Sequence, residues 1–370
     1  MMRTVLLSDI CSYVNSKIQV EQVQLTNYVS TENLLQNKGG LSVANKLPSG
    51  KVTAFQAGDV LVSNIRPYFK KIWLADRSGG ASNDVLVFRK LNDEIYEKYL
   101  YYILADDRFF SFSTASASGS KMPRGDKTQI MNYPVNLPPL DQQKKIANIL
   151  SSLDEKIELN RRMNETLEQL GQALFRHYFV DNLEAKNWDE GTLGDIMNIT
   201  MGQSPPGKSY NNNGDGVVFY QGRADFGLRY PNMRLFTTDP KRFAKVGDVL
   251  LTVRAPVGDV NQASERCCIG RGLAAISSRT GAVSFCYYYC HQLKADFLEY
   301  NSEGTVFGSI NSKQLKDLKL KIPPIGLVEK FENEVAVIDK TIMLNSYQVK
   351  TLVVLRDSLL PKLISGGIEV

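Results

Sequence analysis

The sequence is poor in the residues from which catalytic and metal sites are usually built. It contains two histidines, His177 and His291, so a histidine-based catalytic triad or a histidine-rich metal site has little to draw on. No G-x-G-x-x-G motif follows an expected strand, which argues against a dinucleotide-binding fold. Acidic residues are common, but no pair stands out as an acid and base couple. We therefore expect a protein without a catalytic site of its own.

Long apolar runs and cysteine frameworks are missing as well. No stretch approaches the roughly 20 apolar residues that a membrane span needs, and the N-terminal segment lacks the apolar core of a signal peptide. The five cysteines are an odd number with no framework spacing, since Cys11 is isolated, Cys267 and Cys268 are adjacent, and Cys286 and Cys290 fall four apart on an expected helix. No C-x₂-C pair supports a zinc site, so we expect them to be small buried residues. A cytoplasmic protein that does not enter a membrane is the expectation.

The net charge of +5 over 370 residues is modest, but it is unevenly distributed. Residues 1–138 hold 16 Lys and Arg against 12 Asp and Glu, and residues 200–322 hold 16 against 10. The remaining segments, 139–199 and 323–370, together hold 12 against 17. A basic excess confined to two blocks suggests two surfaces that face a polyanion.

An internal repeat at an offset of 185 residues sets the domain organisation. Two pairs of segments match at that offset, Leu153–Asn160 with Ile338–Asn345 and Pro138-Pro139 with Pro323-Pro324. Upstream the register drifts by a few residues, and Gly58–Ser63 resembles Gly247–Thr252 while Leu6–Ile10 resembles Leu193–Ile196. Each half runs from a globular segment into a long helix. We expect two globular domains at 1–138 and 188–322, a central helix within 139–187 and a C-terminal helix within 323–370.

The two helical segments carry a seven-residue apolar pattern, which predicts that they pair as a coiled coil. The main seam positions are Ile146, Leu153, Asn160 and Leu167 in the first helix and Ile338, Asn345 and Leu352 in the second. The pattern adds Ile149, Lys156, Met163, Leu170 and Leu174 in the first helix and Phe331, Leu355 and Leu359 in the second, with a polar interruption at Lys156 and Asn160. Pro361 and Ser365-Gly366-Gly367 are expected to end the second helix. At about 38 residues and 1.5 Å per residue, each helix is about 57 Å long.

The seam asparagines suggest how the helices are oriented. Asn160 and Asn345 each lie near the middle of their helix, so an antiparallel pair brings the two amides together and fixes the register. A parallel pair would also match them, but the chain would then have to run back past an entire domain. We favour an intramolecular antiparallel coiled coil with pseudo-two-fold symmetry. The alternative is that both amides are solvated or contact a partner protein.

The globular segments are expected to be mixed α/β, which makes the whole chain an α+β protein. Apolar, β-branched runs predict strands at 58–65, 85–88 and 246–253. One helix is expected in each domain, at 94–112 and 284–300, with Gly-, Ser- and Asn-rich loops between the elements.

One motif imitates a nucleotide site. Gly202–Ser209 satisfies the phosphate-loop pattern G-x-x-x-x-G-K-S, which works through consecutive backbone N–H groups and a following helix N-terminus. Pro205 and Pro206 remove two of these donors, and the Asn- and Gly-rich stretch at 210–216 does not favour a helix. We therefore expect a basic surface loop that can touch a phosphate.

Side chains suited to DNA are concentrated in the loops of both globular segments. Arg and Lys bind phosphates and guanine edges, and Asn and Gln bind adenine. The candidates are Asn64, Arg66, Lys70, Lys121 and Arg124 in the first segment, and Lys208, Tyr210, Gln221, Arg223, Arg254 and Arg271 in the second. Each one alone could equally be a solvated surface residue, so the prediction rests on the doubled set.

Several stretches resemble the specificity subunits of type I restriction–modification systems. They are Leu137–Ile146, Leu153–Ile157, Leu174–Asp181, Gly202–Pro206 with Tyr210, and Leu359–Gly366. The resemblance covers essentially the whole chain, and the central helix is its most specific part. The start of the second helix departs from it, because Ile325–Glu329 lacks the Asp-Gln-Gln of residues 141–143.

The resemblance implies that residues 1–138 and 188–322 are target-recognition domains, each reading one half of a split, asymmetric sequence in double-stranded DNA. The paired helices are expected to set the unread gap and to bind two methyltransferase subunits. Separate restriction subunits would act as nuclease and translocase. S-adenosylmethionine, ATP and Mg are expected on these partners, with no cofactor or metal in this chain.

Two other functions stay open from the sequence. A coiled-coil adaptor with two globular modules would show no salt-dependent DNA affinity, whereas neutralising Z phosphates gives a log–log salt slope of about −0.9Z. A phosphate-loop enzyme would bind a nucleotide at Gly202–Ser209.

Overall fold

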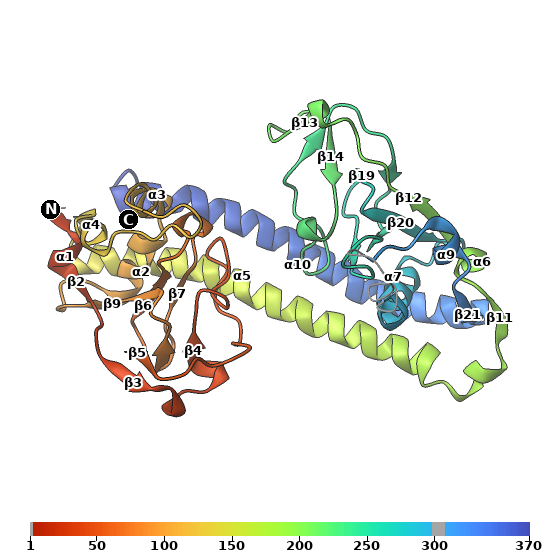
Figure 1. The fold of residues 1–370 in the computed structure, drawn as a ribbon, viewed down its shortest axis with the longest axis horizontal. Coiled ribbons are helices and arrows are strands. Elements are labelled where there is room, and N and C mark those ends of the chain that lie inside the picture. The colour runs from red at the N-terminus through yellow and green to blue at the C-terminus, as the bar shows by residue number, and fades with distance from the viewer. Residues whose placement is uncertain (1–2, 298–307) are drawn as a thin grey trace. The chain divides into compact units, whose positions relative to one another are not determined.

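The computed structural model describes residues 3–297 and 308–370, which form two compact units (Figure 1). Unit 1 comprises residues up to 160 together with 347–370, and unit 2 comprises residues 161–346. Helix α5 (Leu140–Phe175) begins in unit 1 and ends in unit 2, and helix α10 (Ile325–Ser365) runs from unit 2 into unit 1.

Unit 1 contains two four-stranded sheets and a short strand pair. The first sheet has the order β2 (Cys11–Tyr13), β9 (Val85–Lys90), β6 (Val60–Ser63), β7 (Ile72–Leu74). The second has the order β3 (Lys17–Gln19), β5 (Lys51–Phe55), β8 (Gly79–Ala81), β4 (Tyr28–Val29). Strands β1 (Arg3–Leu6) and β10 (Pro134–Leu137) pair separately, and the α-helices are α1 (Leu7–Ile10), α2 (Glu97–Ala105), α3 (Asp107–Ala115) and α4 (Lys127–Met131).

Unit 2 repeats this plan. Its first sheet has the order β12 (Met197–Met201), β20 (Leu273–Ser278), β17 (Val249–Thr252), β18 (Val260–Gln262). Its second has the order β13 (Tyr210–Asn211), β15 (Phe236–Thr237), β14 (Val217–Tyr220), β19 (Cys267–Ile269), β16 (Phe243–Ala244). Strands β11 (Asp189–Thr192) and β21 (Lys319–Ile322) pair separately, and the α-helices with assigned bounds are α6 (Leu193–Ile196), α7 (Val283–Gln292) and α9 (Ser312–Lys316).

The repeated Gly-Asp turn shows why the two copies fold alike. Gly58 and Gly247 have φ of 90° and 87°, a left-handed conformation that favours glycine. The following aspartates close the same turn, since Asp59 accepts from the N–H of Gln56 at 2.8 Å and Asp248 accepts from the N–H of Lys245 at 2.8 Å. Each turn leads into the central strand of its domain, β6 or β17.

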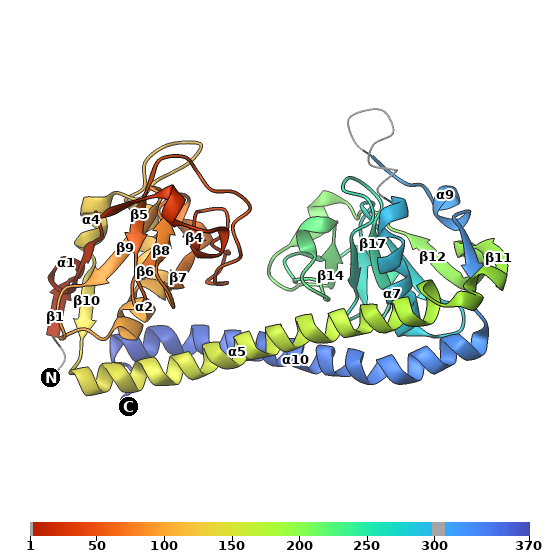
Figure 2. The ribbon, with the colours of Figure 1, turned by 90° about the horizontal axis from the view of Figure 1, so that it is seen from below.

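These central strands are apolar on both faces because each is covered on both faces. Val60 and Val62 pack into the cluster that contains α2 and α3, whereas Leu61 packs into the cluster between the two sheets. In unit 2, Val249 and Leu251 face the α7 side and Leu250 faces the second sheet. Figure 2 shows α2 beside the strands of unit 1 and α7 beside the strands of unit 2. The expected strands at 58–65, 85–88 and 246–253 are therefore confirmed in position.

The expected helix at 94–112 is wrong in detail, because the chain forms two helices, α2 and α3. Asp106 separates them, and its carboxylate accepts from the N–H of Arg108 at 2.8 Å as the N-cap of α3. The helix expected at 284–300 is observed as α7, which ends at Gln292, and positions 298–300 lie outside the described residues.

Within each unit the two long helices pair antiparallel, as predicted. In unit 1, Asp154 bonds Arg356 at 2.8 Å and Asn160 donates to Gln348 at 3.0 Å. In unit 2, Asn345 donates to Asn164 at 3.0 Å. The two seam asparagines thus each bond a polar residue of the opposite helix within their own unit, and a direct bond between Asn160 and Asn345 stays a prediction.

One half of the predicted seam was misassigned. Of the main positions, Ile146, Asn160 and Asn345 are buried, and Leu153, Leu167, Ile338 and Leu352 are partly buried. The second row of the seam on α5 consists of Leu150, Ile157, Asn164 and Gly171, one residue beyond the predicted row Ile149, Lys156, Met163 and Leu170, which is exposed. Apolarity alone selected the wrong row, because Asn164 is buried through hydrogen bonds and Gly171 through the close approach of Tyr288.

The predicted end of the second helix is confirmed at Ser365-Gly366 and is wrong at Pro361, since α10 continues through Pro361 to Ser365. A proline removes one helical hydrogen bond, but Leu360, Leu363 and Ile364 are buried in the core of unit 1 and hold the last turn in place. The helix stops at Gly366, which has φ of 77°.

Candidate nucleic-acid interface

In unit 1, four of the predicted basic residues lie on two neighbouring loops. The loop after β6 carries Arg66 and Lys70, and the loop before α4 carries Lys121 and Arg124. Backbone and side-chain bonds join them, since Arg66 N donates to Pro123 O at 2.8 Å and Arg66 Nη2 donates to Lys121 O at 3.2 Å. The structure therefore brings these four residues together.

Two of these cations already have carboxylate partners. Lys70 lies 2.7 Å from Asp107, and Arg124 lies 3.1 Å from Asp84. Exposed ion pairs of this kind contribute at most about 1 kcal/mol, so a phosphate can compete with them. Lys121 is exposed and has no ion pair among the described residues.

The first loop is also conformationally strained. Arg66 and Lys70 have φ of 50°, and together with Asn37 and Lys38 they are the non-glycine residues with positive φ in the described part of the chain. Asn37 N donates to Phe69 O and Lys38 N donates to Lys70 O, both at 2.9 Å, so all four lie in one place. Such backbone conformations cost on the order of 1 kcal/mol or more each and concentrate at functional sites.

Asn64 differs from its neighbours because it is 6% exposed. Its backbone bonds Asp84 and Gly125, and its side chain lies beneath the loops. This burial argues against a direct DNA contact by Asn64.

In unit 2, three strand ends meet at one edge and carry three predicted residues. The parallel strands β14 and β19 end side by side, and Gln221 and Arg271 follow them. The end of β17 joins them through Val253 N, which donates to Gly272 O at 3.0 Å, and this strand leads to Arg254. All three side chains are exposed, and those of Arg254 and Arg271 have no ion pair among the described residues.

Arg223 lies on the same side and is tied to a carboxylate. Its Nε is 2.7 Å from Asp259, and Lys294 Nζ is 2.9 Å from the other oxygen. Partial burial raises the pKa of Asp259, but hydrogen bonds and charge from Lys294 and Arg223 lower it further, so the net shift is downward. The carboxylate stays ionised between two cations, and the cluster keeps a net positive charge.

The phosphate-loop look-alike folds as a structural loop. Ser209 N donates to Pro206 O at 2.9 Å, and Tyr210 OH donates to Pro205 O at 2.9 Å. The segment leads into strand β13 rather than into a helix. Tyr210 is held against Phe219, with ring centroids 5.0 Å apart, whereas Lys208 is exposed.

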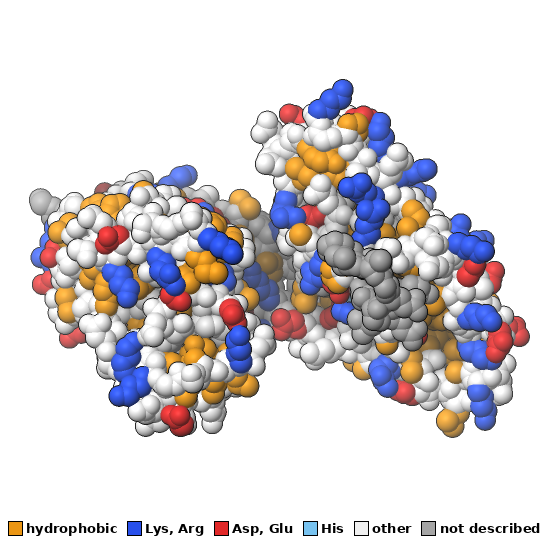
Figure 3. All heavy atoms as spheres, in the orientation of Figure 1, with side chains coloured by type: hydrophobic (Ala, Val, Ile, Leu, Met, Phe, Trp, Pro, Cys, Tyr) orange, Lys and Arg blue, Asp and Glu red, His pale blue; other side chains and the backbone are white. Residues whose placement is uncertain are grey.

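Figure 3 shows Lys and Arg side chains spread over the visible face of the first domain and over the β13–β14 part of the second. Asp and Glu side chains are interspersed with them, in agreement with the small net excess of positive charge. Both faces have the charge that a nucleic-acid phosphate requires.

The sequence did not single out Arg229, the largest fully buried side chain of the described residues. Its Nη1 donates to Glu168 at 2.8 Å, and its Nη2 lies 2.9 Å from Asp339. Nothing in its sequence neighbourhood distinguishes it from a surface arginine. Gln143 was similarly missed, since the Asp-Gln-Gln motif gave no sign that its last residue is 1% exposed.

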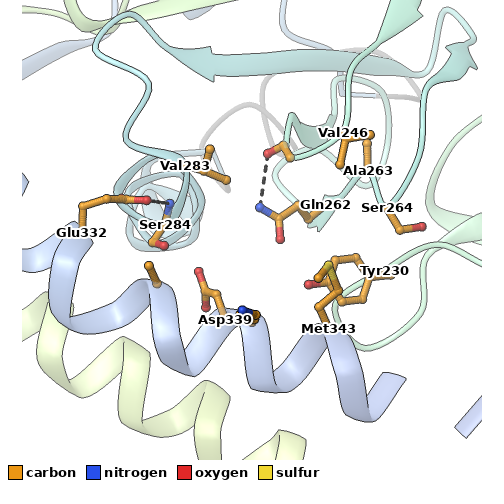
Figure 4. Close-up of a pocket in the computed structure, with 13 residues that line it drawn as sticks. Tyr230, Val246, Gln262, Ala263, Ser264, Val283, Ser284, Glu332, Asp339 and Met343 are labelled. Carbon is orange, nitrogen blue, oxygen red and sulfur yellow. Dashed lines mark hydrogen bonds between the residues drawn. The ribbon is translucent and has the colours of Figure 1, made fainter. Parts of the chain in front are cut away.

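A pocket of about 320 Å³ lies beside Arg229, between α10 and the turn before β17 (Figure 4). Asp339 and Gln262 point into it, and Val246, Val283 and Met343 line its walls. Its two carboxylates are engaged elsewhere, because Glu332 accepts from Ser284 N at 3.1 Å and Asp339 pairs with Arg229. The pocket therefore offers no free acid and base couple.

Residues 3–297 and 308–370 contain no group of three His, Cys, Asp or Glu placed to hold a metal ion. The five cysteines are free and buried, as expected for packing residues. In the same ranges, no helix has the length and apolarity that crossing a membrane requires.

Comparisons with known proteins point to one family. A family model described as the type I restriction modification DNA specificity domain matches residues 2–169 and 185–330. The chain is 33% identical to the putative type I restriction enzyme MjaX specificity subunit of Methanocaldococcus jannaschii, over 78% of this chain and 72% of that protein. It is 22% identical to the type I restriction enzyme HindI specificity subunit of Haemophilus influenzae, over 98% of each.

A solved structure shares the fold. The crystal structure of the type I restriction-modification system S subunit from M. genitalium aligns with a TM-score of 0.63 and 19% identity, and the alignment covers 98% of this chain and 96% of that one.

Proposed function

Since the chain belongs to the family of type I restriction–modification DNA specificity domains, we propose that its two domains read the two halves of a split, asymmetric target in double-stranded DNA. The chain is the DNA-recognition subunit of such a system. The observation that carries the proposal is that both domains have basic loops at the same place in the fold, since Arg66 follows β6 and Arg254 follows β17.

Differences between the two faces support an asymmetric target. The cations without an ion pair among the described residues lie at different places on the two faces, with Lys121 in the loop before α4 of unit 1, and Arg254 and Arg271 after β17 and β19 of unit 2. Because base recognition depends on which donors are free and where they point, two faces of different chemistry favour two different half-sites.

The helices are suited to set the unread gap. Helix α5 has 36 residues, which at 1.5 Å per residue gives about 54 Å. One turn of B-DNA is about 34 Å, so a helix of this length is longer than the distance between successive grooves on one side of the duplex.

Repeated exposed leucines on the helices support the docking of two identical partners. Leu159 and Leu344 occupy the same position of the repeat, and both are 51% exposed. Leu170 and Leu355 are a second such pair, at 46% and 42% exposure. Exposed apolar side chains that recur in a repeat favour one interface used twice. We assign these positions to two methyltransferase subunits.

The remaining chemistry belongs to partners in this proposal. The chain would be non-catalytic, and S-adenosylmethionine would be held by the methyltransferase subunits, with ATP and Mg on restriction subunits. The carboxylates of the described pocket are engaged in capping and ion pairing, which supports this division of roles.

The decisive experiment is to co-express the chain with its neighbouring methyltransferase and map methylated adenines across the host DNA. We expect a split motif with a fixed gap, which disappears when the chain is omitted. If no new methylation appears although both proteins are soluble and associated, an adaptor function would be favoured instead.

Docking is tested by stoichiometry. We expect Leu159→Glu and Leu344→Glu each to lower the number of bound methyltransferase subunits from two to one, and the double variant to bind none, as measured by native mass spectrometry. Leu183→Glu is the matched control, because Leu183 is 85% exposed but lies outside the two long helices. If the control variant lost as many methyltransferase subunits, the interface would not lie on the two long helices.

A further inference from the structure

A single buried arginine ties the second recognition domain to the helix pair. Arg229 lies in the loop between β14 and β15, and its side chain is 1% exposed. Its guanidinium bonds Glu168 of α5 at 2.8 Å, lies 2.9 Å from Asp339 of α10 and bonds Gln262 of β18 at 3.1 Å. It also stacks on Tyr287 of α7, 3.4 Å from the ring centroid. One side chain thus joins the loop to four other elements.

The Arg229 side chain keeps its positive charge. Burial by itself lowers the pKa of Arg229, but Tyr287, Asp339 and Glu168 raise it, and the net shift is well upward. The tyrosines remain neutral, since burial raises the pKa of both Tyr287 and Tyr288. The arrangement is therefore one buried cation between two carboxylates, a geometry that loses stability when one partner is removed.

Part of this network is present in both copies of the repeat. Tyr288 OH donates to Asp339 at 3.0 Å, and in unit 1 Tyr102 OH donates to Asp154 at 2.7 Å. Asp154 and Asp339 occupy the same repeat position. Both aspartates also have a buried arginine, so an Asp–Tyr–Arg group lies on the helices in each unit.

The arginine comes from different places in the two units. In unit 1 it is Arg356, which belongs to α10 itself and lies 2.8 Å from Asp154. The corresponding position on α5 is Gly171, where an added Cβ would lie 2.1 Å from the Tyr288 hydroxyl. Because this position carries no side chain, the second copy takes its guanidinium from the recognition loop.

We infer that Arg229 is a positioning residue that fixes the orientation of the second recognition domain on the helix pair and so enforces the length of the unread gap. The inference rests on the proposed reading of a split target. Because the Arg229 side chain is buried, it acts through the domain it holds and does not touch DNA.

The accuracy that gap measurement demands explains why such a fixed contact is useful. Adding one base pair moves a half-site by about 3.4 Å along the duplex axis and rotates it by about 34°. A domain free to rock by that amount would accept neighbouring gap lengths. A planar guanidinium bonded to α5 and α10 and stacked on α7 restricts both movements, because its donors have fixed directions.

The test uses the full chain co-expressed with the methyltransferase and a set of targets with identical half-sites and gaps that differ by one base pair. The neutral variant Arg229→Met with Glu168→Gln and Asp339→Asn removes the charges without leaving one buried and unpaired. We expect the same half-sites but at least a tenfold loss of discrimination between the native gap and its neighbours. Arg279→Gln, an exposed arginine of the same domain, should match the wild type.

Arg229→Lys keeps a buried cation without the planar fork, and it covers the case in which the neutral variant does not fold. We expect a loss of at least threefold in gap discrimination. Wild-type discrimination in a folded variant would overturn the inference, and so would loss of the second half-site itself, which would make Arg229 part of the reading surface. Absence of any split motif in the wild type would instead refute the proposed function.

Discussion

The sharpest stability prediction concerns Gln143, at the start of α5. Its side-chain Nε2 donates to Glu94 O at 2.8 Å and to Pro138 O at 2.9 Å, and its Oε1 accepts from Tyr96 N at 2.9 Å. Tyr96 is the N-cap residue of α2, but its side chain makes no capping hydrogen bond. Gln143 therefore satisfies backbone groups at the junction of the first domain and its long helix.

Replacing Gln143 with Leu removes three hydrogen bonds and leaves their backbone partners without an alternative. Each bond contributes about 1 kcal/mol net, and unpaired buried groups add to the cost, so we expect unit 1 to lose at least about 3 kcal/mol. For a domain of this size, 1 kcal/mol shifts Tm by about 2–4 °C, which gives a decrease of at least about 6–12 °C.

The assay can follow unit 1 alone, because the chain has two tryptophans, Trp73 in unit 1 and Trp188 in unit 2. In a Trp188→Phe background, urea and thermal unfolding are recorded from Trp73 fluorescence. Gln142→Leu is the matched control, since Gln142 is the adjacent residue of the same type and is only partly buried. If Gln143→Leu came within 1 kcal/mol of this control, the assigned role of Gln143 would be refuted.

Three further predictions concern the gap, one half-site and pH. Deleting seven residues from each long helix shortens the pair by about 10.5 Å, or about three base pairs, so methylation mapping should show a shorter gap with unchanged half-sites. Arg254→Ala should weaken recognition of one half-site by about 1–3 kcal/mol, and equal damage to both would mean that Arg254 is structural. Burial lowers the pKa of His291, so unit 2 should be fully stabilised above about pH 6.5 and lose stability as pH falls through the lowered pKa. Trp188 fluorescence in a Trp73→Phe background should show this slope, and His291→Gln should flatten it.

The repeat and the strands could be predicted because local sequence determines them. The Gly-Asp turns require a left-handed glycine followed by an aspartate that closes the turn, and these two residues are visible in the sequence at Gly58 and Gly247. The antiparallel pairing of the helices could also be predicted, because a parallel pair would require the chain to run back past an entire domain.

The seam was only half predicted because apolarity is a poor guide where a helix buries polar groups. Met163 and Leu170 are more apolar than Asn164 and Gly171, yet Asn164 and Gly171 are buried and Met163 and Leu170 are exposed. Asn164 is buried because it bonds Ser346 and Ile342 O of α10. These partners are distant in sequence, so no local pattern reveals them.

The departure at the start of the second helix shows how the two copies solve one problem differently. The position that corresponds to Gln143 is Val328, which is buried and cannot cap a helix. The N-terminus of α7 is capped instead by Glu332, which accepts from Ser284 N at 3.1 Å and Phe285 N at 3.0 Å. Glu332 lies one helical turn beyond Val328, on the same face of α10. The second helix therefore caps a helix of its domain although it lacks the Asp-Gln-Gln motif.

Gly171 makes the two halves of the chain unequal. Arg356 lies on the helix itself, so the Asp–Tyr–Arg group of the first unit is complete without a residue from a recognition loop. At Gly171 the helix gives no side chain, and the second recognition loop must contribute Arg229. A recognition domain grafted onto the second position would therefore need an arginine in the loop that faces α5, whereas one grafted onto the first position would not. The two halves of the repeat have similar folds but unequal freedom to accept a new domain.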